Sequence, residues 1–174
     1  MPTFINFNGD LIDNVEAWTP LVTKLLGEYN VLISIHPKMA VMNPSVKTSL
    51  EKVGFSVDAS KGRNLKTLYQ AADLVFGDYG GSVLSTIYMK KKLILLNSPN
   101  QNYINWRKSR QYIDDEVRSD VKAIDLRNNL NLLESINQVI QKNDLSKRVE
   151  IKEKYFGRDC NYDELRMVFK NLST

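Results

Sequence analysis

Short runs of apolar residues alternate along the chain with segments in which apolar residues recur at helical spacing. Several of these runs are almost continuously apolar, which is typical of strands that a parallel sheet buries on both faces. The runs predict strands at residues 3–7, 31–35, 55–57, 74–76, 93–96 and 121–124. Strand–helix alternation with short connections predicts an α/β fold in which helices cover both faces of a parallel sheet.

The segments between the runs supply the helices of this fold. Their spacing predicts helices at residues 10–26, 45–53, 65–71, 82–89 and 130–140, and a helical tail from residue 145 with a break around 157–161. Gly27 is a stop signal for the first of them. The segment 97–120 has the least regular pattern. Its aromatic side chains stand among basic ones, which suits a surface loop, a partner face or a contact with polar headgroups.

Length and composition narrow the class of protein. A chain of 174 residues with 43% hydrophobic and 25% charged residues is enough for one well-packed globular domain. A net charge of +4 does not by itself indicate nucleic acid, and no nucleic-acid partner is expected. Two basic clusters, at residues 90–92 and 107–110, are interpreted as solvated faces. No apolar run reaches the ~20 residues of a membrane span, and no signal peptide is recognisable.

Cysteine and histidine are too scarce for a zinc site or an internal disulfide. The chain has one cysteine, Cys160, and one histidine, His36. We therefore expect neither a metal nor a cofactor.

A glycine turn after the run 74–76 is the first candidate for chemistry. The residues are Asp78, Tyr79, Gly80, Gly81 and Ser82. Ligands of open parallel sheets bind at the carboxyl ends of the strands, and glycines followed by a helix N-terminus form a cradle for phosphate. The spacing matches neither a Walker loop nor the dinucleotide fingerprint. The alternative is a turn without a ligand, in which the side chain of Ser82 or Asp78 caps the helix.

The second candidate is His36-Pro37, at the end of the run 31–35. Pro37 fixes its own φ and holds His36 extended, which presents the ring above the sheet edge. There it could hydrogen-bond to a departing phosphate or protonate it. In the alternative, His36 is a strand-end residue that is satisfied locally.

The runs LISIHP (32–37) and ADLVFGDYGGSVLSTIYMKKKLILL (72–96), with PTF at residues 2–4, resemble the C-terminal half of the CDP-glycerol glycerophosphotransferases of teichoic acid synthesis. The resemblance implies a Rossmann-like donor-binding domain of the glycosyltransferase-B architecture over residues 1–174. It implies an N-terminal acceptor domain that these residues do not include, without which the fragment is expected to be inactive. The implied location is the cytoplasm, with peripheral contact at the inner face of a bacterial membrane.

The resemblance also implies a reaction, the transfer of a polyol phosphate from a CDP-linked donor to a cell-surface polymer. His36 would stabilise the leaving CMP. The donor phosphates would be bound by Pro37, Asp78, Tyr79, Gly80, Gly81, Ser82 and Ser85.

The chain departs from the family pattern at three places. Gly80 and Gly81 replace paired serines, Ser85 stands where an acidic residue is expected, and Lys92 replaces a proline. Two alternatives therefore stay open. One is a UDP-sugar-binding domain of the epimerase or glycosyltransferase kind, because a Gly-Gly turn also occurs in UDP-N-acetylglucosamine 2-epimerases. The other is a non-catalytic Rossmann-like domain.

Overall fold

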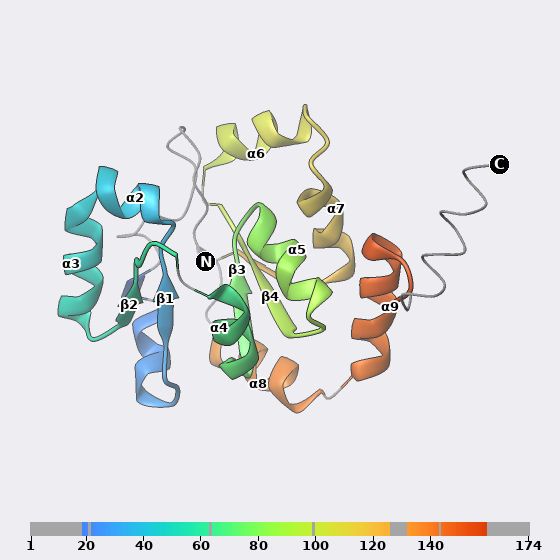
Figure 1. Cartoon of the computed structure of the whole chain (residues 1–174), viewed down its shortest axis with the longest axis horizontal. Coiled ribbons are helices and arrows are strands. Elements are labelled where there is room, and N and C mark those ends of the chain that lie inside the picture. Colours follow the sequence, from blue (N-terminus) through green and yellow to red (C-terminus); the bar gives the residue numbers. More distant parts are fainter. Residues whose placement is uncertain are drawn as a thin grey trace.

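The computed structural model describes residues 19–20, 22–62, 64–98, 100–125, 132–142 and 144–159. Their strands form two parallel sheets (Figure 1): β1 (Leu32–Ser34) pairs with β2 (Ser56–Asp58), and β4 (Lys92–Asn97) lies between β3 (Leu74–Gly77) and β5 (Ala123–Asp125). The predicted parallel α/β fold is confirmed, and it is consistent with a Rossmann-like architecture. The expected strand at 3–7 lies outside the described residues.

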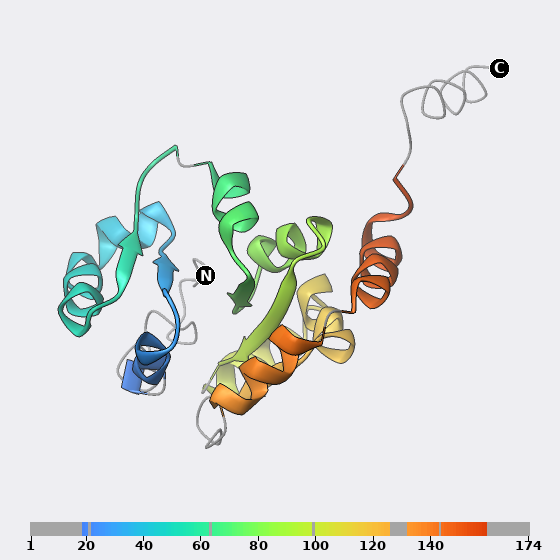
Figure 2. The ribbon, with the colours of Figure 1, turned by 90° about the horizontal axis from the view of Figure 1, so that it is seen from below.

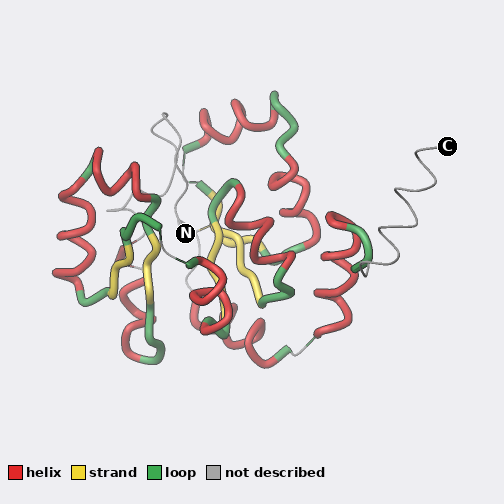
Figure 3. Tube along the Cα trace, in the orientation of Figure 1, coloured by secondary structure: helices red, strands yellow, loops and turns green. Residues whose placement is uncertain are grey.

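Helices connect and flank the strands (Figure 3). In chain order they are η1 (Lys24–Gly27), α2 (Pro37–Met42), α3 (Pro44–Val53), α4 (Leu65–Ala71), α5 (Gly81–Tyr88), α6 (Gln101–Lys108), α7 (Ile113–Asp120), α8 (Leu132–Gln141) and α9 (Leu145–Phe156). The predicted end at Gly27, the helix at 65–71 and the break after Phe156 are confirmed. The other predicted helices and strands are present where the structure describes them, and every described end lies within two positions of its prediction. Residues 10–18 of the first predicted helix lie outside the described residues.

Strand β4 shows why helices lie on both sides of the three-stranded sheet. Because strand side chains alternate between faces, Ile94 and Leu96 point to one face and Leu93 and Leu95 to the other. The first pair packs in the cluster that contains α8, and the second pair packs in the cluster that contains α5. Figure 2 shows β4 between these two helices. Burial on both faces explains the continuous apolar run from which the strand was predicted.

The α8 side of β4 also belongs to the core of the two-stranded sheet. One apolar cluster contains Ile33 and Ile35 at β1, Phe55 beside β2, and Ile94 and Leu96 of β4. The two sheets therefore share a hydrophobic core. A cavity of about 630 Å³ lies between them, lined by residues of both β1 and β3.

Two regions differ from their predicted structure. Residues 37–42 form helix α2, with Pro37 at its first position, where a proline costs no hydrogen bond. Residues 97–120, predicted to be irregular, contain α6 and α7. These two helices have few apolar residues, and they are held together by a buried Arg107–Asp114 ion pair that spacing does not reveal. Arg107 is only 3% exposed, so the interpretation of residues 107–110 as a solvated face is wrong at Arg107.

Candidate functional site

The candidate residues lie at the edge of the sheets where the parallel strands end. Helix α2 follows β1 and helix α5 follows β3, and both begin at this edge (Figure 1). His36 is the N-cap of α2, and Gly80 is the N-cap of α5. The topology thus brings both sequence-predicted groups to one edge, on different sheets.

The glycine turn owes its shape to Gly80. Its φ of 92° and ψ of −161° lie in a region that is essentially restricted to glycine. Gly81 is the first residue of α5, and a Cβ built on it would meet no atom within 4 Å. Gly81 is exposed, whereas its neighbour Ser82 is buried. The turn therefore needs glycine at position 80 for its backbone conformation, and position 81 leaves open space above the helix N-terminus.

A carboxylate of the protein already lies at this helix N-terminus. The backbone N–H of Gly80 donates to Oδ2 of Asp114, at 2.8 Å. The carboxylate comes from the first turn of α7, 34 residues further along the chain. The first N–H groups of a helix have no intrahelical acceptor and carry partial positive charge, so they favour an anion. Asp114 supplies one.

Arg107 of α6 holds Asp114 in place. Its guanidinium lies 2.5 Å from Oδ2 of Asp114 and 3.1 Å from Oδ1 of Asp115, and a further N–H donates to the hydroxyl of Tyr103 at 3.3 Å. Burial lowers the pKa of Arg107, but the hydrogen bonds to Asp115 and Tyr103 outweigh that effect and raise it overall. Arg107 therefore stays charged, and with Asp114 it forms a buried, hydrogen-bonded ion pair.

Arg118 of α7 closes the same edge from the other side. It donates to the backbone carbonyl of Asp78 and, at 2.9 Å, to Oδ1 of Asn97 at the end of β4. Its guanidinium also lies 3.9 Å from the centre of the Tyr79 ring, and that of Arg107 lies 4.4 Å from it. Burial lowers the pKa of Arg118 and raises that of Tyr79. Two arginines, two carboxylates and a tyrosine thus form one network against the glycine turn.

Three of the predicted binding residues are buried beneath the turn. Asp78 is 0% exposed, and Tyr79 is 3% exposed and accepts the N–H of Ser98 through its hydroxyl, at 2.9 Å. The buried Oγ of Ser82 has no hydrogen-bond partner among the described residues. Because this hydroxyl makes no hydrogen bond there, the alternative in which Ser82 caps α5 is wrong, whereas a cap by Asp78 stays a prediction. Ser85 is exposed one turn beyond Gly81, on the same face of α5.

The His36 ring is exposed and takes part in a local hydrogen bond. Its Nδ1 accepts the backbone N–H of Lys38 at 3.2 Å, which makes His36 the N-cap of α2. His36 has φ −58° and ψ 131°, so the predicted extended backbone before Pro37 is confirmed. An Nδ1 that accepts a hydrogen bond carries no proton, so the ring proton is at Nε2. The ring can donate from Nε2 while Nδ1 caps the helix.

The residues that sequence reasoning missed are Arg107, Asp114 and Arg118. Asp114 contacts Gly80 and Arg118 contacts Asp78, each more than 30 positions away in the chain, and Arg107 reaches the turn through Asp114. No local spacing therefore links the three to the turn. A weaker signal was present. Three consecutive acidic residues begin at Asp114 and a basic residue, Arg118, follows two positions after the last of them. This is the charge pattern of a helix with an acidic first turn and a basic last turn. It would have located α7, although not its partner.

Metal and membrane features are absent from the part of the chain that the structure describes. Within it, no group of three or more histidine, cysteine or acidic side chains could hold a metal ion. No described helix combines the length and the apolar character that crossing a membrane requires. Comparisons with protein-family models, curated proteins and solved structures each found no match.

Proposed function

We propose that this domain binds the diphosphate of a nucleotide-linked donor at the glycine turn, as the donor half of a transferase. The observation that carries the proposal is the hydrogen bond from Gly80 to the Asp114 carboxylate. It places an anion at the position where a phosphate oxygen would sit in a liganded domain. The open space above Gly81 and the Ser82 hydroxyl, which has no hydrogen-bond partner among the described residues, support the same proposal.

In this proposal Asp114 occupies the anion position until a donor arrives. A phosphate would displace the carboxylate from the Gly80 N–H, and Arg107, released from Asp114, could pair with the phosphate instead. Arginine forms bidentate pairs with phosphate as readily as with carboxylate, so the exchange keeps its charge compensated. Binding would then require a shift of α7 relative to α5.

His36 would act at the same edge as a hydrogen-bond donor through Nε2. Negative charge that develops on a leaving phosphate would strengthen that bond, so its effect would fall mainly on kcat. The cap on Nδ1 favours donation of a hydrogen bond over transfer of a proton, because a protonated Nδ1 could no longer accept from Lys38. The resemblance in sequence suggests a CDP-linked polyol phosphate as donor and a polymer as acceptor, at the cytoplasmic face of a membrane.

A second candidate function is a non-catalytic domain. The buried Arg107–Asp114 pair favours it, since a turn that is closed by the protein's own carboxylate needs no ligand. The two candidates differ in whether a nucleotide can displace Asp114.

An amide NMR titration with CDP-glycerol, CDP, UDP and UDP-N-acetylglucosamine distinguishes them. For the first candidate we expect the amides of Gly80, Gly81 and Ser82 to shift with one of these ligands. Asp114→Asn should tighten binding about tenfold, because a carboxylate no longer competes for the Gly80 N–H. Asp115→Asn is the matched control: it makes the same charge change and also removes an acceptor of Arg107, but Asp115 makes no recorded contact with Gly80.

Each result of the titration has a clear meaning. A preference for CDP ligands supports a polyol phosphotransferase, and a preference for UDP ligands supports a sugar-nucleotide enzyme. If no ligand shifts these amides even in Asp114→Asn, the donor-binding proposal fails and the non-catalytic domain remains.

A further inference from the structure

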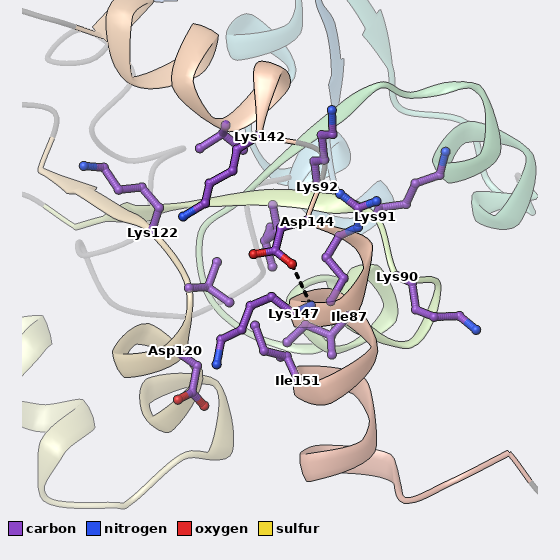
Figure 4. A pocket seen from close by; sticks show the side chains of 14 residues that line it. Ile87, Lys90, Lys91, Lys92, Asp120, Lys122, Lys142, Asp144, Lys147 and Ile151 are labelled. Atoms are coloured by element: carbon purple, nitrogen blue, oxygen red, sulfur yellow. Dashed lines mark hydrogen bonds between the residues drawn. The ribbon is translucent and has the colours of Figure 1, made fainter.

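A basic pocket lies at the opposite edge of the three-stranded sheet, where the strands begin. We define it by its lining: Ile87, Lys90, Lys91, Lys92, Leu93, Asp120, Val121, Lys122, Val139, Lys142, Asp144, Lys147, Arg148 and Ile151. Its volume is about 190 Å³. In Figure 4, Lys142 and Lys147 lie beside Asp144, whereas the side chains of Lys90 and Lys122 point outward from it.

The pocket concentrates the positive charge of the molecule. Its lining has seven cationic and two anionic side chains, and seven minus two gives a formal charge of +5. The whole chain has a net charge of +4, so all remaining residues together contribute −1. The excess of cations over the chain is thus located at one edge of one sheet, which a scatter of solvated lysines would not produce.

The two carboxylates of the basic pocket differ in where their partners lie: Lys147, a partner of Asp144, lines the pocket, and the partners of Asp120 lie outside it. Asp144 caps α9 by accepting from the N–H of Lys147 at 2.9 Å, and this hydrogen bond holds its pKa below the ordinary value. Asp120 accepts from Lys154 and Tyr155, each at 2.6 Å, and neither of these two residues lines the pocket. The lysines that line the pocket are therefore only partly neutralised.

The cations divide into those with a structural partner and those without. Lys91 donates to two carbonyls at the end of α4, at 2.9 Å each, and Lys92 donates to Ile140 near the end of α8. Lys147 pairs with Glu150 on the same helix, and Lys90 pairs with Asp159 at 3.7 Å. The side chains of Lys122 and Lys142 are exposed and make no recorded hydrogen bond or ion pair within the described ranges.

The floor of the basic pocket is apolar. Ile87 of α5, Leu93 of β4 and Ile151 of α9 are buried there and belong to one hydrophobic cluster. A ligand that fits must offer negative charge to the rim and carbon to the floor. An organic phosphate does both, because its oxygens pair with lysine ammonium groups and its alkyl part can cover apolar surface.

We infer that the basic pocket is a second ligand site, for a phosphate ester with an apolar substituent. It lies away from the edge where parallel sheets bind substrates, so the ligand is a docking or regulatory group rather than a donor. The inference does not depend on the proposed function, since it involves no residue of the glycine turn. Lys122 and Lys142 are its main contacts.

Titration with inorganic phosphate and with hexyl phosphate, followed by amide NMR, tests the inference. We expect hexyl phosphate to shift the amides of Leu93, Val121 and Ile151, and to bind several-fold more tightly than inorganic phosphate, since one buried methylene is worth about fourfold. Lys122→Gln/Lys142→Gln should weaken binding about tenfold or more. The matched control is Lys66→Gln/Lys108→Gln, which removes the same charge from exposed lysines outside the pocket.

Vesicle flotation then identifies the source of the phosphate. Binding to phosphatidylglycerol vesicles but not to phosphatidylcholine vesicles, lost in the Lys122/Lys142 variant, assigns a lipid headgroup. Binding of hexyl phosphate without vesicle binding assigns a soluble ester. Equal weakening in both double variants would mean unspecific attraction to a basic protein, and this result, or the absence of any shift with hexyl phosphate, overturns the inference. A thermal melt of each variant shows that it is folded.

Discussion

The two edges of the three-stranded sheet differ in whether their charged side chains are paired and buried or exposed. At the carboxyl edge, Arg107 and Arg118 are surrounded by carboxylates, carbonyls and aromatic rings, and both are largely buried. At the amino edge, exposed lysines gather over an apolar floor, and Lys122 and Lys142 make no recorded side-chain pair among the described residues. Paired and buried charges fix a structure, whereas exposed and unpaired charges remain available to a ligand. The edge that the fold predicts to bind is thus closed by the protein's own Asp114, and the other edge is open.

The largest effect should come from Arg107→Ala. The variant leaves Asp114 buried at 4% exposure without its cation, and breaking such a pair costs about 3–5 kcal/mol. Urea unfolding measures the loss. Lys108→Ala, on the exposed face of the same helix, should change the free energy of unfolding by no more than about 0.5 kcal/mol. If both variants lose the same small amount, the carboxyl edge is not held by this pair.

The next largest difference in stability is expected between alanine variants of two adjacent glycines. Gly80→Ala forces a side chain into a backbone conformation that is essentially restricted to glycine, at a cost of about 1–3 kcal/mol. Gly81→Ala falls in open space at a helical position and should lie between no change and about 1 kcal/mol of stabilisation. Thermal unfolding of the two variants measures the difference. Equal melting temperatures would show that the turn is not held in this geometry.

Alkaline pH should weaken the carboxyl edge through Tyr79. Burial raises the pKa of Tyr79 above 10, so the folded state keeps the phenol proton that the unfolded state releases. The stabilisation is complete below about pH 10 and is lost as pH rises through the folded pKa. Tyr79→Phe should cost about 1 kcal/mol at pH 7 by removing the acceptor of the Ser98 N–H. Unfolding between about pH 7 and pH 11 should show that this difference shrinks.

The smallest effect should come from the amino edge. Lys122→Gln/Lys142→Gln removes two like charges from the basic pocket and should change stability by no more than about 0.5 kcal/mol. The variant should differ from the wild type mainly in how its stability depends on salt concentration. Wild-type protein should gain stability between about 0.01 M and about 0.15 M salt as repulsion is screened, and the variant should gain less. A parallel response of the two proteins would indicate that the lysines do not repel one another.

Local signals in the sequence explain which parts of the fold could be predicted. The continuous apolar run Leu93–Leu96 predicted β4, because both faces of that strand are buried. Gly27 correctly predicted the end of a helix. Helix α2 was missed because Pro37 was interpreted only as a rigid neighbour of His36, although proline is also favoured at the first helical position.

The site was predicted only in part, because its contacts join distant segments. The glycine turn and the N-terminus of α5 could be located from Gly80 and Gly81 alone. The contact between Asp114 and Gly80 depends on how α7 packs against the glycine turn. A polar contact between residues 34 positions apart produces no periodic pattern in the sequence, so it could not be predicted from spacing. The buried side chains of Asp78 and Tyr79 support the turn from beneath, a role that motif spacing cannot separate from ligand contact.

Strand β4 has a consequence for the order in which amide hydrogens exchange with solvent. It is hydrogen-bonded to β3 on one side and to β5 on the other, and apolar clusters cover both of its faces. No local opening exposes such a strand, so its amides should exchange only when the whole domain unfolds. The amides of α7, on the contrary, should exchange through a smaller opening, because Val117 is its one buried apolar side chain and its other buried residue, Asp114, makes polar contacts. Deuterium labelling would therefore place the helix that carries Asp114 among the first elements to open and β4 among the last.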